Sequence, residues 1–170
     1  LVTTVAGALP RRVDGRGAEA RFQFLDALAL DQAGNVFVSD RGTLRKITPS
    51  GVVTTVAELT QSPPPFITQI SLSLDAGGNA LVTQLEGHRT ILRRVSPSGV
   101  VDTIQIPDMP NVVQAAYDRA GNLFATDHRG LWKISPDRTS TRISDLTNGF
   151  VLNDRGDVFI WASEGYRRIN

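Results

Sequence analysis

Residues 31–51, with the sequence DQAGNVFVSDRGTLRKITPSG, decide how this chain folds. They predict a tight turn, a strand, a second turn, another strand and a third turn. Asp31 can accept hydrogen bonds from backbone N–H groups two or three residues further on, and Gly34 can adopt the positive φ that closes such a turn. Related sequences return three more times, at intervals of roughly 40 residues, with turns that begin at Asp75, Asp118 and Asn153. The chain therefore contains four internal repeats.

Each repeat contains four short runs with the composition of β-strands. An apolar run precedes the turn and a β-rich run follows it; a basic-apolar run and a run rich in Val and Thr come next, separated by a Pro turn. In the first repeat these four runs are residues 25–30, 36–40, 44–47 and 52–56. Four antiparallel strands per repeat are typical of a β-propeller blade.

We therefore predict an all-β fold, a β-propeller in which four four-stranded blades are visible, within a single domain of residues 1–170. Helical periodicity is absent, so no long helix is expected. The predicted blades cover about 25–57, 69–105, 112–144 and 149–170, the last one together with residues 1–6.

The two ends of the chain complement each other. Residues 1–6, LVTTVA, nearly repeat the fourth-strand sequence VVTTVA of residues 52–57, whereas residues 166–169 match a third strand that no fourth strand follows. We expect residues 2–6 to pair with residues 166–169 and to complete the last blade, within the chain or across to a second copy. A closed four-bladed monomer, a homodimer with an eight-bladed ring and a segment of a longer repeat array are all compatible with this pattern.

The composition limits the choice of partners. The chain has 170 residues, 41% hydrophobic and 21% charged, as in an ordinary globular domain. It contains no cysteine, which excludes disulfides and thiolate metal sites, and the lack of cysteine and of an initiator Met favours an extracytoplasmic location. The formal net charge of +1 gives no general attraction to nucleic acid, and no apolar run approaches the roughly 18 residues of a membrane span. We expect no nucleic-acid or membrane partner, no metal and no cofactor.

The first repeat and its lead-in resemble an NHL repeat. The resemblance rests on VTTVAG at residues 2–7, on DGRGAEARF at 14–22 and on the repeat sequence of 28–51. The second and third repeats keep the turn and the basic-apolar strand, whereas the fourth has Trp161-Ala162 where the family favours a small residue followed by Asp. The resemblance implies a propeller, usually of six blades, that serves mainly as a binding platform. A few related six-bladed propellers are lyases or hydrolases.

Strand alternation sorts the loops onto two faces of the predicted propeller. The repeated Asp-x-x-Gly turns and the Pro turns share one face, which we call the turn face. The turns between second and third strands and the links between blades share the other, the irregular-loop face. Because variable loops on a rigid scaffold commonly carry function, we expect a binding site on the irregular-loop face. Its loops are 40–42, 86–89, 127–130 and 163–165, and its links are 7–24, 59–66, 106–111 and 145–149.

Both histidines of the chain fall in equivalent loops of adjacent blades, and an arginine follows each of them. Arginine side chains can bind an anion or a carboxylate, and a histidine can transfer a proton. Two imidazoles alone cannot supply the three or more ligands of a zinc site. The alternative is that these are solvated loop residues, with Asp40 and Asp127 bonding turn backbone. The predicted binding residues are Arg41, His88, Arg89, Asp127, His128 and Arg129.

The sequence contains no nucleophile elbow, phosphate loop, zinc signature or paired-carboxylate motif, so no catalytic residue is assigned. The leading hypothesis is a non-catalytic binding module that holds a protein, peptide or glycan on the irregular-loop face. One alternative is a propeller lyase or hydrolase built on the His, Arg and Asp loop residues. Another is a structural segment of a larger repeat protein. The basic pairs such as Arg45-Lys46 are expected to form ion pairs between blades or to cover apolar surface.

Overall fold

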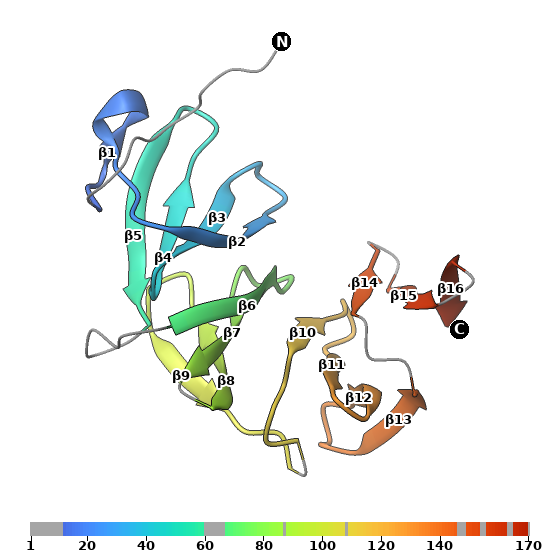
Figure 1. Cartoon of the computed structure of the whole chain (residues 1–170). Coiled ribbons are helices and arrows are strands. Elements are labelled where there is room, and N and C mark those ends of the chain that lie inside the picture. Colours follow the sequence, from blue (N-terminus) through green and yellow to red (C-terminus); the bar gives the residue numbers. More distant parts are fainter. Residues whose placement is uncertain are drawn as a thin grey trace.

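The computed structural model describes residues 12–59, 67–86, 88–107, 109–145, 149–153, 156–162 and 165–169 (Figure 1). In these ranges the chain is almost entirely antiparallel β-sheet, and its one helical element is a 3-10 turn, η1 (Gly17–Glu19). The same ranges contain no helix with the length and apolar character needed to cross a membrane. The predicted all-β class is confirmed.

The first two repeats form blades 1 and 2, in which all neighbouring strands are antiparallel. Blade 1 contains β1 (Gly15–Arg16), β2 (Leu25–Leu30), β3 (Val36–Asp40), β4 (Thr43–Ile47) and β5 (Val52–Glu58), in the order β1-β5-β4-β3-β2. Blade 2 contains β6 (Ile67–Leu74), β7 (Ala80–Glu86), β8 (Arg89–Val95) and β9 (Val101–Ile104), in sequential order. The additional strand β1 pairs with the outer strand β5 and protects the edge of blade 1.

The last two repeats form blades 3 and 4. Blade 3 contains β10 (Gln114–Tyr117), β11 (Leu123–Asp127), β12 (Gly130–Ile134) and β13 (Ser140–Ser144). Blade 4 contains β14 (Phe150–Leu152), β15 (Val158–Ala162) and β16 (Gly165–Ile169). Residues 1–6, predicted as the fourth strand of this blade, lie outside the described residues, so their pairing with β16 stays a prediction.

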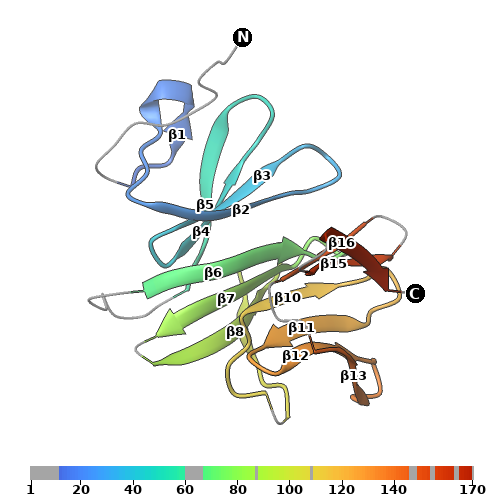
Figure 2. The same cartoon turned by 45° about the vertical axis from the view of Figure 1, so that its right-hand side comes forward.

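The four blades follow one another around a common centre as a β-propeller, which confirms the predicted architecture (Figure 1). The first strands β2, β6, β10 and β14 lie innermost, and β5, β9 and β13 lie at the periphery. Blades 2 and 3 lie side by side, as Figure 2 shows from another angle. Polar side chains also join neighbouring inner strands: Ser73 Oγ donates to the Ala115 carbonyl at 2.8 Å, and Gln114 Nε2 donates to the Phe150 carbonyl at 2.8 Å.

Apolar layers between consecutive blades form the core. The layer between blades 1 and 2 is built on Phe37, Leu44, Ala80 and Val82. Blades 2 and 3 share Leu81, Leu92, Ala115 and Leu123. Blades 3 and 4 share Phe124, Leu131, Phe150 and Val158. Blades 2 and 3 therefore each bury one sheet face against the blade before and the other face against the blade after.

Local hydrogen bonds explain why the repeated turns form. Asp31 Oδ1 accepts hydrogen bonds from the backbone N–H of Ala33 at 2.9 Å and of Asn35 at 2.8 Å, and Asn35 Nδ2 donates to Asp31 Oδ2 at 2.7 Å. Gly34 has a φ of 78°, as the turn requires. Asp75 and Asp118 make the same contacts in their own turns. The side-chain amide of Asn35 and the backbone bonds hold the pKa of Asp31 below its usual value.

The lead-in, residues 12–24, covers the face of blade 1 that points away from blade 2. Its Ala20 and Phe22 pack on Val38 and Val53. Figures 1 and 2 both show β1 and η1 of the lead-in at the outer edge of this blade.

A buried guanidinium fastens the lead-in to the sheet. Arg45, fully buried, donates to Asp40 Oδ2 at 3.1 Å, to Asp14 Oδ1 at 2.8 Å, and to the carbonyls of Val13 at 2.9 Å and Arg21 at 2.6 Å. Asp40 Oδ1 accepts the N–H groups of Gln23 and Phe24. Arg45 thus pairs within its own blade and lead-in, and not between blades as the sequence suggested.

Candidate functional site

The predicted binding residues lie on three hairpin turns of the irregular-loop face. Arg41 lies in the β3–β4 turn with a φ of 45°, is exposed, and donates its backbone N–H to the Phe24 carbonyl at 3.1 Å. His88 is exposed in the β7–β8 turn, and Arg89 begins β8. Asp127 ends β11, and His128 is exposed at the tip of the β11–β12 turn.

The structure brings Asp127 and Arg129 together. Asp127 is buried, and its Oδ2 accepts a hydrogen bond from Arg129 Nε at 2.8 Å. Its Oδ1 accepts the Arg129 backbone N–H at 2.9 Å and Trp132 Nε1 at 3.2 Å. Burial raises the pKa of Asp127, but the bonds from Arg129 and Trp132 outweigh it and leave the pKa below its usual value. These contacts build the turn and present His128 to solvent.

Asp40 has a comparable structural role, because its Oδ1 accepts the backbone N–H groups of Gln23 and Phe24 beside the β3–β4 turn. The β7–β8 hairpin contains a side-chain hydrogen-bond network, in which Arg93 Nη1 donates to Gln84 Oε1 at 2.7 Å and to Glu86 Oε1 at 2.8 Å. In each hairpin, the acidic side chain near the loop is occupied by the scaffold. The residues left to meet a ligand are those that point outward.

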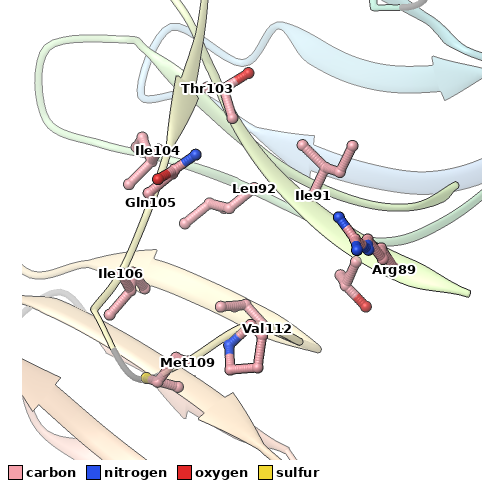
Figure 3. Close-up of a pocket in the computed structure, with 11 residues that line it drawn as sticks. Arg89, Ile91, Leu92, Thr103, Ile104, Gln105, Ile106, Met109 and Val112 are labelled. Atoms are coloured by element: carbon pink, nitrogen blue, oxygen red, sulfur yellow. The ribbon is translucent and has the colours of Figure 1, made fainter.

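A pocket of about 360 Å³ lies beside Arg89, between β8, the end of β9 and the link that leads to blade 3. We call it the blade 2–3 pocket. Figure 3 shows Leu92, Ile106, Met109 and Val112 pointing toward a shared space, with Arg89 at its margin. Its volume falls in the range of roughly 300–1,000 Å³ typical of small-molecule sites. Its other lining residues are Thr90, Ile91, Thr103, Ile104, Gln105 and Pro110.

The link between blades 2 and 3 shapes this pocket. Met109 folds back so that its N–H donates to the Ile106 carbonyl at 3.2 Å, and both side chains are buried in the layer between the blades. Asn111 Oδ1 accepts the backbone N–H of Thr90 at 3.4 Å, which holds the link against the start of β8. The floor of the pocket is therefore continuous with the core.

Among the described residues, Arg89 has no acidic partner, whereas Arg93 and Arg129 each pair with a carboxylate. Glu86 lies directly across the β7–β8 hairpin from Arg89, but its carboxylate pairs with Arg93 at 2.8 Å. Among the described residues, no carboxylate lies within ion-pair distance of the Arg89 guanidinium. The pocket thus combines aliphatic and polar side chains with a positive charge at its rim that no described carboxylate neutralises.

A second hollow, of about 490 Å³, lies on the other side of Thr103–Ile106. It extends to the turn face, where Pro136 and Arg138 line it. Its Arg94 is already paired with Asp75 Oδ2 at 3.7 Å. The blade 2–3 pocket is the better candidate, because no described carboxylate pairs with its cation and it opens on the face where the loops vary.

Sequence reasoning missed Asp26 on the innermost strand β2. Burial, followed by the nearby charge of Asp40, raises the pKa of Asp26, and its Oδ2 is buried with no hydrogen-bond partner among the described residues. The available signal was an acidic residue within the apolar run LDALAL, where the next two repeats have Ile70 and Val113. A carboxyl group with a raised pKa near the centre of a propeller is a candidate functional group.

Replacing Asp26 by asparagine should raise the free energy of unfolding at neutral pH by up to about 1 kcal/mol, because the buried charge is removed. The pKa of Asp26 is higher in the folded than in the unfolded protein, so the wild type loses stability as the pH rises above the usual pKa of 3.8. The advantage of the variant should therefore vanish below that pH. Urea denaturation at several pH values measures the stability difference between the variant and the wild type. A variant that stays more stable in acid would contradict burial of the Asp26 charge as the cause.

Within the described ranges, no three His, Asp or Glu side chains form a group that could hold a metal ion. The two exposed histidines belong to turns of different blades.

The chain matches no protein-family model and no curated protein. It does match solved structures. Virginiamycin B lyase from Staphylococcus aureus aligns with a TM-score of 0.57 at 11% identity, over 85% of this chain and 54% of that chain. Regucalcin, a calcium-binding protein from Agrobacterium tumefaciens, aligns with a TM-score of 0.59 at 15% identity, over 79% and 52%. A protein of unknown function from Bacteroides thetaiotaomicron has a TM-score of 0.59 at 16% identity, over 92% and 44%.

This chain spans about half the length of these solved proteins. At such low identity the likeness shows the fold alone, and the resemblance to NHL repeats stays a prediction. By fold, the chain is a β-propeller.

Proposed function

We propose that this chain is a non-catalytic binding module that holds a peptide or a segment of a protein on its irregular-loop face. The observation that carries the proposal is the blade 2–3 pocket, a hollow with an aliphatic wall whose rim bears the guanidinium of Arg89, which pairs with no carboxylate among the described residues. An aliphatic side chain of the ligand fills the hollow, and a carboxylate beside it pairs with Arg89.

The lining of the pocket favours a peptide over a glycan. Leu92, Ile106, Met109 and Val112 offer no hydrogen bonds from their side chains, so this wall suits an aliphatic side chain better than sugar hydroxyl groups. The polar lining residues Thr90, Thr103 and Gln105 can bond to the backbone of a peptide. In this proposal Arg41, His88 and His128 contact the ligand beyond the pocket, because they are exposed on the same face. Asp127 and Arg129 act through the turn that they build.

Peptides that carry a leucine followed by a glutamate should bind to the chain, and Arg89→Ala should weaken that binding by about tenfold, the effect of losing one partly exposed ion pair. Fluorescence anisotropy with a labelled Leu-Glu hexapeptide measures the affinity. A matched Leu-Gln peptide should bind the wild type as weakly as the Leu-Glu peptide binds the variant.

Arg119→Ala is the matched control, since Arg119 is exposed in a turn of the opposite face. It should leave the affinity unchanged. If Arg119→Ala weakens binding and Arg89→Ala does not, the site has been assigned to the wrong face. If neither peptide binds and a neutral oligosaccharide does, the peptide assignment is wrong.

A propeller lyase or hydrolase is the second candidate, favoured by Asp26 with its raised pKa and unpartnered oxygen. One structural neighbour is a lyase, and a catalytically inactive form of it has been solved with quinupristin. Mass spectrometry of quinupristin incubated with this chain and with Asp26→Asn tests the alternative directly. Conversion that the substitution abolishes would support it, and intact quinupristin in both samples would count against this substrate.

A further inference from the structure

The hollow of about 490 Å³ lies where the Pro turn of blade 3 faces the outer strand of blade 2. We call it the turn-face pocket. Ile104, Leu123 and Ile134 give it an apolar wall, and two arginines, Arg94 and Arg138, line it as well. Its volume falls in the range of roughly 300–1,000 Å³ that small-molecule sites occupy. The pocket is therefore large enough for a ligand of its own.

The Pro turns explain why this space exists. Gly51, Gly99 and Arg138 hold the same position in the Pro turns of blades 1, 2 and 3, with φ angles of 80°, 87° and 68°. A Cβ atom on Gly99 would collide with the carbonyl oxygen of Val56, so the turn of blade 2 packs directly on the outer strand of blade 1. Arg138 has a Cβ atom, so blade 3 cannot approach the equivalent residue of blade 2, Ile104, in the same way.

The outer strand of blade 2 also differs from that of blade 1. Val56 is the additional residue of a β-bulge in β5, where the register shifts between Leu44 and Arg45 of the partner strand. β9 pairs with β8 in a continuous register and ends at Ile104, whereas β5 continues to Glu58. The bulge that meets the Pro turn of blade 2 thus has no counterpart in the described strand β9, and the space between blades 2 and 3 stays open.

Arg138 is an unusual residue for its place in the turn. A positive φ is uncommon for any residue other than glycine, and the other two Pro turns use glycine there. Such a backbone conformation persists where its surroundings require it, and it occurs often at binding sites. Arg138 is exposed and lines the pocket, and no carboxylate in the described ranges lies within ion-pair distance of its guanidinium. Its charge is therefore left for a ligand.

Arg94 supplies a second positive charge. It lies opposite Leu81 in the β7–β8 pair, so it is on the sheet face that blade 3 covers. Its ion pair with Asp75 spans 3.7 Å and its side chain is 45% exposed, which leaves guanidinium donors for another acceptor. Asp102, opposite Arg94 on β9, is exposed and lines the same pocket. Two positive charges thus face one negative charge, a balance that suits a ligand with a single negative charge.

We propose that the turn-face pocket binds a small monocarboxylate with an aliphatic or aromatic body. The carboxylate accepts hydrogen bonds from the guanidinium groups of Arg94 and Arg138, whose planar donors match the two carboxylate oxygens. The body covers the apolar wall, and Asp102 disfavours a second negative charge on the ligand. This site and the peptide site proposed on the irregular-loop face use different arginines, so each can be tested without the other.

Titration of the chain with hydrocinnamate, followed in proton–nitrogen NMR correlation spectra, measures the affinity and locates the probe. We expect a dissociation constant of about 1 mM, with the largest shifts in the amide signals of Ser135 and Arg138. The uncharged amide of the same acid should bind at least about fivefold more weakly. Arg94→Met should weaken the binding of hydrocinnamate about fivefold, and Asp102→Asn should strengthen it about twofold, because one removes an attractive charge and the other a repulsive one.

Arg138→Gly is the decisive variant. Glycine adopts a φ of 68° without strain, so the variant should unfold at the temperature of the wild type or above it. Its affinity for hydrocinnamate should nevertheless fall about fivefold or more, because the guanidinium is gone. A role of Arg138 in the fold alone would not produce this combination.

Arg89→Ala is the matched control, because Arg89 lines the other pocket, and it should leave the affinity for hydrocinnamate unchanged. No binding below about 20 mM, equal binding of the amide and the carboxylate, or full affinity in a folded Arg138→Gly variant would each overturn the proposal. A loss of affinity caused by Arg89→Ala and not by Arg138→Gly would place the probe in the blade 2–3 pocket and overturn it as well.

Discussion

Replacement of Arg45 by methionine is expected to lower the free energy of unfolding by about 3–5 kcal/mol, the usual result of removing one member of a buried ion pair. The Asp40 carboxylate, fully buried, would lose its cation, and the carbonyls of Val13 and Arg21 would lose a donor. The Phe22 ring, whose centroid lies 4.7 Å from the guanidinium carbon, would lose part of its packing. Urea denaturation at one fixed protein concentration measures the change.

Two further variants test whether the lost hydrogen bonds and ion pairs of Arg45 cause this loss of stability. Arg45→Lys keeps the charge but cannot reach four acceptors with one ammonium group, so its loss of stability should lie between those of wild type and Arg45→Met. Arg94→Met removes an exposed arginine whose ion pair with Asp75 spans 3.7 Å, and it should cost less than about 1 kcal/mol. If Arg45→Met lowers the free energy of unfolding as little as Arg94→Met does, the contacts of Arg45 do not hold the lead-in on the sheet.

Phe124→Ala should destabilise the chain by about 3–5 kcal/mol, because it opens a cavity between blades 3 and 4. Phe124 is buried in one layer with Leu131 and Val158, and its ring centroid lies 6.3 Å from that of Phe150. The hydrogen-bonded sheets of blades 3 and 4 can relax only partly into this cavity. Thermal and urea unfolding followed by circular dichroism measure the effect.

Val100→Ala serves as the comparison for Phe124→Ala, since Val100 lies in the Pro turn of blade 2 and is more than half exposed. It should change stability by no more than about 0.5 kcal/mol. If the two substitutions cost the same, the layer between blades 3 and 4 contributes little, and blade 4 unfolds independently of the rest.

The fold could be predicted because its decisive contacts are local. Asp31 bonds to residues two and four positions away, and Gly34 closes the same turn, so five residues contain the whole arrangement. Strand alternation and the Pro turns follow from equally short spacings. The repetition adds to this information, because four similar units in a row, each with apolar residues on both sheet faces, have few ways to pack other than as blades.

The candidate site could be predicted only as a face of the molecule. The hairpin turns that carry Arg41, His88 and His128 follow from strand order, but the partners of each side chain do not. Asp127 and Arg129 are two residues apart, so their contact was accessible to local reasoning. The blade 2–3 pocket was not, because Met109 and Leu92 meet only when the link folds back against β8.

The sequence by itself determined the strands, their turns and the all-β class, since those depend on hydrogen bonds and side-chain alternation within a few residues. Tertiary structure alone decided which charges are buried and which faces stay open. Arg45 finds Asp14, 31 residues earlier in the chain, only because the lead-in crosses the sheet. Leu28 and Tyr166 match residues that are buried or partly buried in other blades, so their exposure depends on how the blades are arranged in space and not on the local sequence pattern.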